Sequence, residues 1–105
     1  MIKVLFVCTG NICRSPAAEG IFKKFVWDAN LENDISVDSA GTIGYHSGEL
    51  PDARMRKHAS ARGYNLDSRA RQFNPKNDYE EFDYIITMDN YNYADLMQLD
   101  HKKLH

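Results

Sequence analysis

The chain alternates between short segments suited to buried strands and longer amphipathic segments suited to helices. Residues 2–7 form a nearly continuous apolar run, which is typical of a strand covered on both faces. Residues 35–41 and 84–88 predict two further strands. Between the first two strands, apolar residues recur at the spacing of one helix face: Ala18, Ile21, Phe22, Phe25 and Val26. A strand, a helix and a strand in this order predict a βαβ unit with parallel strands.

Turn and cap residues delimit the remaining helices. Pro51 is predicted to open a second helix, and Gly63 is predicted to end it. Residues 64–82 are polar and turn-rich, with room for one short helix. Asp89 or Asn90 is predicted to cap a last helix. This alternation favours an open α/β sheet, in which a ligand binds beyond the carboxyl ends of the strands.

Composition narrows the class of protein. A chain of 105 residues, of which 43% are hydrophobic and 27% charged, is typical of one soluble globular domain. The net charge of −2 gives no general attraction to nucleic acid or acidic membranes, so neither is expected as a partner. No apolar run approaches the length of a membrane span, and no cleavage-site pattern follows the first apolar run.

The two cysteines, Cys8 and Cys13, lie in one loop. This pair is not the disulfide framework of a small secreted domain, and it lacks the ligand count of a zinc site. The sequence therefore predicts a reduced, cytoplasmic protein with no metal and no cofactor.

Cys8 begins the segment that points most clearly to a chemical function. It directly follows the apolar run, and Arg14 and Ser15 stand six and seven residues later, where a helix is predicted to start at Ser15. A loop between a strand and a helix N-terminus directs backbone N–H groups inward and makes an anion site. A thiolate there is stabilised by those donors, by the helix dipole and by the arginine. The segment thus combines a nucleophile with a receptor for a tetrahedral oxyanion, as phosphate-ester cleavage through a cysteinyl-phosphate requires.

The block 7–19 contains the spacing Cys-x5-Arg-Ser and resembles the low-molecular-weight class of protein tyrosine phosphatases. Three further stretches are similar to that class: 38–42, 69–72 and 82–89. The resemblance implies the phosphatase-I-like fold, an open three-layer αβα sandwich with a mostly parallel sheet. It also implies hydrolysis of phosphotyrosine monoesters, with a phosphotyrosine-containing protein as substrate and inorganic phosphate or a similar oxyanion in the loop.

Three residues are predicted to be catalytic. Cys8 is the expected nucleophile, and Arg14 is the expected bidentate clamp on the phosphoryl oxygens, a role that the planar fork of arginine suits better than lysine. Ser15 is interpreted as a donor to the thiolate, as a helix cap, or as both.

The predicted substrate-binding residues are those of the loop and one aromatic beyond it: Thr9, Gly10, Asn11, Ile12, Cys13 and Tyr45. Gly10 and Asn11 tolerate the left-handed backbone that such a loop needs. In the family, the matching asparagine braces the loop, in some members tethered by a histidine where this chain has Ser68. Tyr45 falls in the loop that walls the substrate slot in the family, where a flat ring stacks on a phenyl ring.

Two loop residues bear on specificity and redox chemistry. Ile12 favours phosphotyrosine, because relatives specific for arginine phosphate tend to have threonine there. The resemblance suggests that a Cys8–Cys13 disulfide protects the nucleophile from over-oxidation, and a simple packing role for Cys13 is the alternative. The related arsenate reductases use further cysteines, so two cysteines disfavour that activity.

One part of the family pattern is missing. The family's general acid is the aspartate of an Asp-Pro pair well after the third strand, and this chain contains no Asp-Pro. Three explanations are open: a truncated member, a natural short form using another acid or none, and a pseudo-enzyme that only binds phosphoryl groups. Truncation is favoured, because the third strand would otherwise be an uncovered apolar edge. Residues 1–105 are then a single domain that lacks the C-terminal part of the fold after the third strand and its helix.

Two carboxylates are candidates for a substitute acid. Asp52 stands at a predicted helix start, where the helix dipole would keep its pKa low. Asp89 stands at a strand end and is expected to brace the loop.

Overall fold

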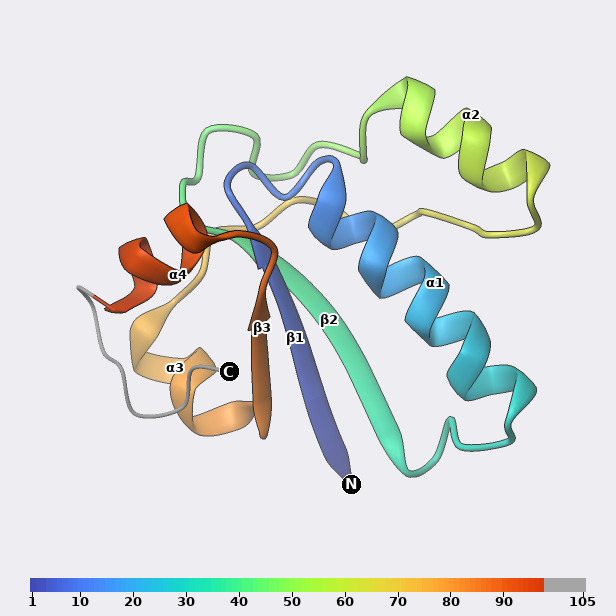
Figure 1. The fold of residues 1–105 in the computed structure, drawn as a ribbon, viewed down its shortest axis with the longest axis horizontal. Helices are drawn as coiled ribbons and strands as arrows, with labels where there is room; N and C mark the ends of the chain where they lie inside the picture. Colours follow the sequence, from blue (N-terminus) through green and yellow to red (C-terminus); the bar gives the residue numbers. More distant parts are fainter. Residues whose placement is uncertain (98–105) are drawn as a thin grey trace.

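A three-stranded parallel sheet forms the centre of the fold (Figure 1). The computed structural model describes residues 1–97. The strands lie in the order β2-β1-β3, with β1 at Ile2–Cys8, β2 at Ile35–Gly41 and β3 at Tyr84–Thr87. The register sets Cys8 beside Gly41, and Val7 beside Thr87, so the three strands end together. This edge of the sheet is where the sequence places the ligand.

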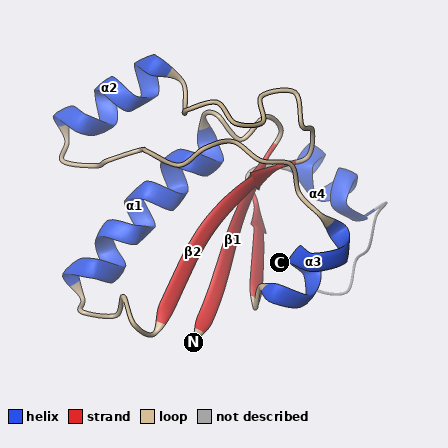
Figure 2. Cartoon of the chain, turned by 180° about the vertical axis from the view of Figure 1, so that it is seen from behind, coloured by secondary structure: helices blue, strands red, loops and turns tan. Residues whose placement is uncertain are grey.

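Side chains of β1 alternate between two separate cores, which explains its continuous apolar run. Val4 and Phe6 pack with Val26 of α1 (Arg14–Asp28) on one face. Leu5 and Val7 pack on the opposite face, where α3 (Pro75–Glu81) and α4 (Asn90–Met97) lie. That second core also contains side chains from β2, β3 and the C-terminal helices: Ala40, Phe73, Tyr79, Phe82, Ile85 and Leu96. Figures 1 and 2 show helices on both sides of the sheet, which confirms the predicted three-layer αβα sandwich.

The buried face of α1 differs from the predicted stripe. The helix begins at Arg14, one residue before the predicted start, and Phe25 is 61% exposed. Glu19 is buried instead, at 3% exposure, because Ser39 and Lys23 both hydrogen-bond its carboxylate. Helical spacing identifies a face but does not reveal which polar residue finds partners on it.

The remaining helix boundaries follow their caps. Asp52 accepts a hydrogen bond from the backbone N–H of Met55 at 3.2 Å, so α2 spans Ala53–Ala61 and begins after Pro51, not at it. Gly63 has a φ of 84° just beyond the C-cap of α2, as predicted. The short helix expected in 64–82 is α3, and Asp89 caps α4 by accepting from the backbone N–H of Asn92 at 2.8 Å. In residues 1–97, no helix combines the length and apolar character that crossing a bilayer would need.

Candidate active site

Cys8 ends β1 at the centre of the site and is 3% exposed. Its Sγ lies 2.9 Å from Ser15 Oγ and accepts the backbone N–H of Asn11 at 3.3 Å. Ser15 Oγ also accepts from Asn11 Nδ2 at 2.8 Å, and the serine hydroxyl can donate to the sulfur or, at 3.5 Å, to the carbonyl oxygen of Ala40. Ser15 lies inside α1, which has no side-chain cap, so the interpretation of Ser15 as a helix cap is wrong.

Asn11 braces the loop, as the resemblance implies. Its φ of 59° is left-handed, and it is 2% exposed. Besides Ser15, its Nδ2 donates to Ser39 Oγ at 2.9 Å, and its Oδ1 accepts from the backbone N–H of Arg71 at 3.0 Å. In this chain the group that tethers Asn11 is therefore the backbone amide of Arg71, in the stretch 69–72 that resembles the family. Ser39 Oγ in turn donates to Glu19 Oε1 at 2.5 Å, which carries the hydrogen-bonded chain away from Cys8.

Backbone hydrogen bonds hold the loop against its neighbours. Thr42 and Ile43, just beyond β2, donate to the carbonyl oxygens of Cys8 and Thr9 at 2.9 and 3.1 Å. The backbone N–H of Asp52 donates to the carbonyl of Ile12 at 2.6 Å, which joins the start of α2 to the loop. These three hydrogen bonds fix the loop against the segment after β2 and the start of α2.

Arg14 stands at the rim of the loop with about half of its side chain exposed, and its Nη1 donates to Asp89 Oδ2 at 2.7 Å. The backbone bond from Asn92 and the bond from Arg14 hold the pKa of Asp89 below its ordinary value. Asn92 is fully buried, and its Nδ2 donates to Thr9 Oγ1 at 3.0 Å. The start of α4 is therefore tied to both ends of the loop, and Asp89 braces the arginine as expected.

The other predicted site residues surround this centre. Cys13 is partly exposed. The pKa of its thiol is raised, first by its partial burial and second by the negative charge of Asp52. Both cysteines are free thiols. His46 packs against Gly10, since a Cβ there would come within 3.1 Å of the imidazole. Tyr45 is 84% exposed, and its ring meets that of His46 edge-on at 5.3 Å between centroids.

Several site residues escaped sequence reasoning. Glu19 was detectable in principle as an acidic residue on an otherwise buried helix face, and Ser39 lies in a stretch that resembles the family. His46 was not singled out from the sequence, yet it contacts Gly10, and its Nδ1 lies 2.9 Å from Glu49 Oε2. Asn92 carries no sequence signal, because its burial depends on how α4 docks on the loop.

The arrangement suits phosphoryl transfer through sulfur. A buried sulfur accepts the Asn11 amide and lies beside the Ser15 hydroxyl, and the loop that follows it ends at Arg14, a residue type that stabilises oxyanions. Within residues 1–97, no cluster of three or more His, Cys, Asp or Glu side chains is arranged to hold a metal ion.

Comparisons with known proteins agree with this chemistry. A profile of the family described as low molecular weight phosphotyrosine protein phosphatase matches residues 3–105. The chain is 50% identical over 99 residues to a putative low molecular weight protein-tyrosine-phosphatase of Synechocystis sp., and 48% identical over 93 residues to the low molecular weight phosphotyrosine protein phosphatase of Homo sapiens. These matches cover 94% and 89% of this chain but only 62% and 58% of the relatives, so the chain spans about three fifths of their length.

A solved structure gives the same result. A crystal structure of a protein tyrosine phosphatase from Entamoeba histolytica is 45% identical and superposes with a TM-score of 0.95, covering 100% of this chain and 69% of that one. The profile match over nearly the whole chain, the sequence identities and the shared fold lead to one conclusion: the chain belongs to the low molecular weight phosphotyrosine protein phosphatase family.

Proposed function

We propose that this protein hydrolyses phosphotyrosine monoesters, with Cys8 as the nucleophile. The observation that carries the proposal is the position of Cys8 Sγ. This sulfur accepts a hydrogen bond from the backbone N–H of Asn11 and lies beside the Ser15 hydroxyl, and Arg14 stands at the rim of the same loop. Membership of the family supports the same reaction. The two free cysteines are consistent with a reducing, cytoplasmic location.

The residues divide the reaction into two steps. In the first, the Cys8 thiolate attacks phosphorus, an S–P bond forms, and the P–O bond breaks with the phenol leaving as a phenolate that takes its proton from solvent. Arg14 and the loop amides hold the three equatorial oxygens as the phosphoryl group flattens. In the second, water attacks phosphorus and gives up a proton to solvent, the S–P bond breaks, and the Ser15 hydroxyl stabilises the departing thiolate by donating to it. Inorganic phosphate is then left in the loop.

The rim supplies the proposed contacts with the tyrosine ring. Tyr45 is exposed and is steadied by its edge contact with the His46 ring, which leaves its face available for stacking on a phenol. Ile12 supplies apolar surface in the same loop and favours an aromatic ester over a guanidino phosphate. Thr9, Gly10 and Cys13 contribute the remaining loop amides.

Cys8→Ser and Arg14→Lys test the proposal in an assay with p-nitrophenyl phosphate. We expect Cys8→Ser to abolish turnover and leave phosphate binding within a few-fold, because the oxyanion donors remain. Arg14→Lys keeps the charge and loses the fork, so kcat should fall by on the order of 10²-fold, as for loss of a transition-state donor. Turnover above a trace in Cys8→Ser, or an Arg14→Lys variant within a few-fold of the parent chain, would contradict these roles.

A second candidate is a module that binds phosphoryl groups without turning them over. The observation that favours it concerns the two carboxylates beside the loop: Asp52 accepts from the Met55 amide, and Asp89 accepts from Arg14 and the Asn92 amide. The bonds from the Asn92 amide and Arg14 hold the pKa of Asp89 below its ordinary value, which makes it a poor proton donor, and the Asp52 carboxylate is engaged as the N-cap of α2. The same assay distinguishes the candidates, since the module binds phosphate and shows no turnover of p-nitrophenyl phosphate in the parent chain.

A further inference from the structure

Basic residues are concentrated on α2 and the turn that follows it. In a chain with a net charge of −2, residues 53–66 contain four of the thirteen basic residues and none of the fifteen acidic ones. These residues are exposed: Arg54, Arg56, Lys57 and Arg62. None of them forms a salt bridge with another residue in the range 1–97. Because α2 also has no buried residue, its charges face solvent without compensation.

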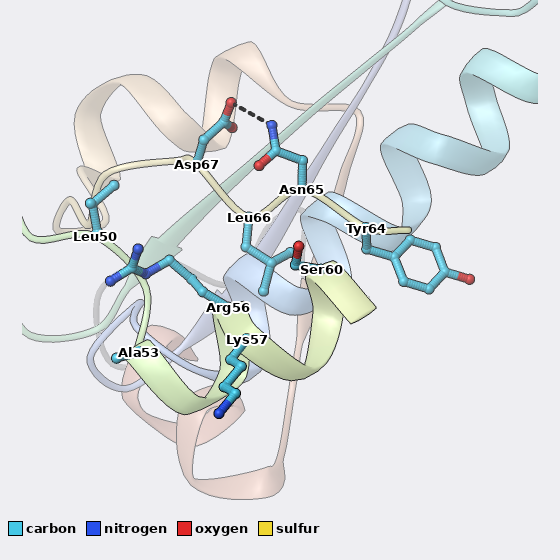
Figure 3. A pocket seen from close by; sticks show the side chains of 9 residues that line it. All are labelled: Leu50, Ala53, Arg56, Lys57, Ser60, Tyr64, Asn65, Leu66 and Asp67. Carbon is cyan, nitrogen blue, oxygen red and sulfur yellow. Dashed lines mark hydrogen bonds between the residues drawn. The ribbon is translucent and has the colours of Figure 1, made fainter. Parts of the chain in front are cut away.

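A cavity of about 420 Å³ lies between α2 and residues 64–67 (Figure 3). Arg56, Lys57 and Ser60 line it from the helix, and Asn65 and Asp67 line it from the opposite segment. The one carboxylate in the cavity, on Asp67, accepts from Asn65 Nδ2 at 3.3 Å. Two cations and one engaged carboxylate leave the cavity positively charged.

A hydrogen bond from the Nε of Arg56 positions its side chain in this cavity. Its Nε donates to the carbonyl oxygen of Pro51 at 3.0 Å, and its terminal nitrogens donate to no residue within 1–97. Figure 3 shows its guanidinium extending from α2 toward Leu50, which also lines the cavity. A guanidinium fixed at Nε presents a fork that matches a carboxylate.

The cavity adjoins the Cys8 loop without sharing residues with it. The start of α2 touches the loop through the 2.6 Å bond from Asp52 N–H to the Ile12 carbonyl, and none of residues 8–15 lines the cavity. Arg56 lies one helical turn beyond Asp52, which is about 6 Å along the axis. An extended peptide covers about 3.3 Å per residue, so about two residues of it cover the distance along α2 from Asp52 to Arg56.

We propose that α2 and this cavity bind an acidic segment flanking the phosphotyrosine of a protein substrate. Carboxylates of that segment pair with the Arg56 fork and the Lys57 ammonium, and Ser60 donates a further hydrogen bond. The inference rests on the proposed function, because the phosphotyrosine in the Cys8 loop is what brings the segment to α2. A neutral segment would leave the cations of α2 unpaired.

Fluorescence anisotropy on the full chain carrying Cys8→Ser, which prevents turnover, tests the proposal. One peptide has a central phosphotyrosine with four glutamates on each side, and its partner has glutamines in their place. We expect the glutamate peptide to bind about five- to ten-fold more tightly in low salt, as two or three partly exposed ion pairs allow. The preference should shrink in 0.5 M NaCl, because salt screens exposed charges. Equal affinities for the two peptides in low salt would overturn the proposal.

Lys57→Glu and a matched control variant test whether the preference for the glutamate peptide arises at α2. Lys57→Glu should remove most of the preference and leave the affinity for the glutamine peptide unchanged. This variant spares Arg56 and its bond to Pro51, so the fold of α2 is kept. Lys24→Glu changes an exposed lysine of α1 that has no salt bridge within residues 1–97, and it should retain the preference. A preference that persists in Lys57→Glu, or falls equally in Lys24→Glu, contradicts a site on α2.

Two further ligands separate this inference from the proposed function. If phosphorylated and unphosphorylated peptides bind equally, the loop does not recognise phosphotyrosine and the proposed function fails. The difference between the unphosphorylated glutamate and glutamine peptides then still reports on α2. A single-stranded DNA of matched charge that binds more tightly than the glutamate peptide would assign the surface to a different partner and overturn the proposal.

Discussion

The two cysteines stand five positions apart in one loop, and the fold gives their sulfur atoms different surroundings. Cys8 Sγ lies next to two hydrogen-bond donors, the Asn11 amide and the Ser15 hydroxyl. Burial and the negative charge of Asp52 raise the pKa of the Cys13 thiol, an effect that the nearby Arg14 only partly offsets. Because the thiolate is the reactive form, the raised pKa makes Cys13 less reactive than an ordinary thiol at the same pH.

Alkylation of Cys13 as a function of pH tests this difference. In a Cys8→Ser background, we expect iodoacetamide to reach half of its maximal rate at Cys13 only above pH 9.0, the ordinary thiol value from which the pKa is raised. Asp52→Asn keeps a good N-cap and removes the charge, so the rate at pH 8.5 should rise by about two-fold. Peptide mass spectrometry measures both rates. A midpoint below pH 9, or no response to Asp52→Asn, would contradict the assignment.

The loop keeps its shape through the elements that contact it. The end of β2 runs so close to the loop that a Cβ on Gly41 would lie 2.6 Å from the Thr9 carbonyl oxygen and 3.1 Å from the Asn11 nitrogen. All of these contacts are with backbone atoms, which have no flexible side chain to move aside. The first residues of α2 and α4 contact the loop as well, through Asp52 and Asn92.

Gly41→Ala should therefore displace the loop. We expect the free energy of unfolding to fall by about 1–3 kcal/mol, the usual cost of overpacking, and phosphate binding to weaken at least ten-fold. Urea unfolding, and the rise in Tm produced by added phosphate, measure the two effects. Gly44→Ala is the matched control, since its Cβ would meet only the side chains of Gln72 and Ser47, which can move. Equal behaviour of the two variants would show that close approach at Gly41 does not set the loop.

At the scale of the whole molecule, Arg71 joins three parts of the chain that are distant in sequence. Its guanidinium pairs with Asp38 of β2 at 3.2 Å and with the buried Asp78 of α3 at 2.9 Å. Its backbone N–H holds the Asn11 side chain in the loop. The burial of Asp78 is tolerated because its carboxylate accepts bonds from Arg71 and from the backbone N–H of Asn74.

Asp78→Asn tests this connection. Removing the carboxylate charge leaves the half-buried Arg71 with only the exposed Asp38, and we expect the free energy of unfolding to fall by about 2–3 kcal/mol. Phosphate binding should weaken too, because Arg71 positions Asn11. Glu81→Gln serves as the control, since it breaks only the exposed pair with Lys3 and should cost less than about 1 kcal/mol in urea unfolding. A loss at Asp78 no larger than at Glu81 would contradict the role given to this ion pair.

The sequence by itself determined the parallel α/β sheet and the location of the site. The apolar run of β1, the helix-start residues after it and the Cys-x5-Arg spacing are local patterns, and local sterics and hydrogen bonding decide them. Cys8, Arg14 and Asn11 were identified in this way, and α2 was predicted to within two residues, whereas α3 was predicted only as one short helix within residues 64–82.

Only the tertiary structure decided which distant side chains support the loop. Asn92, Glu19 and Arg71 act on it from elements that approach only when α1, α3 and α4 pack on the sheet. The exposure of Phe25 and the burial of Glu19 were set in the same way, by partners on another element. Hydrophobic spacing records which face of an element is buried, whereas the pairing of polar groups depends on contacts between residues far apart in the chain, which no local pattern encodes.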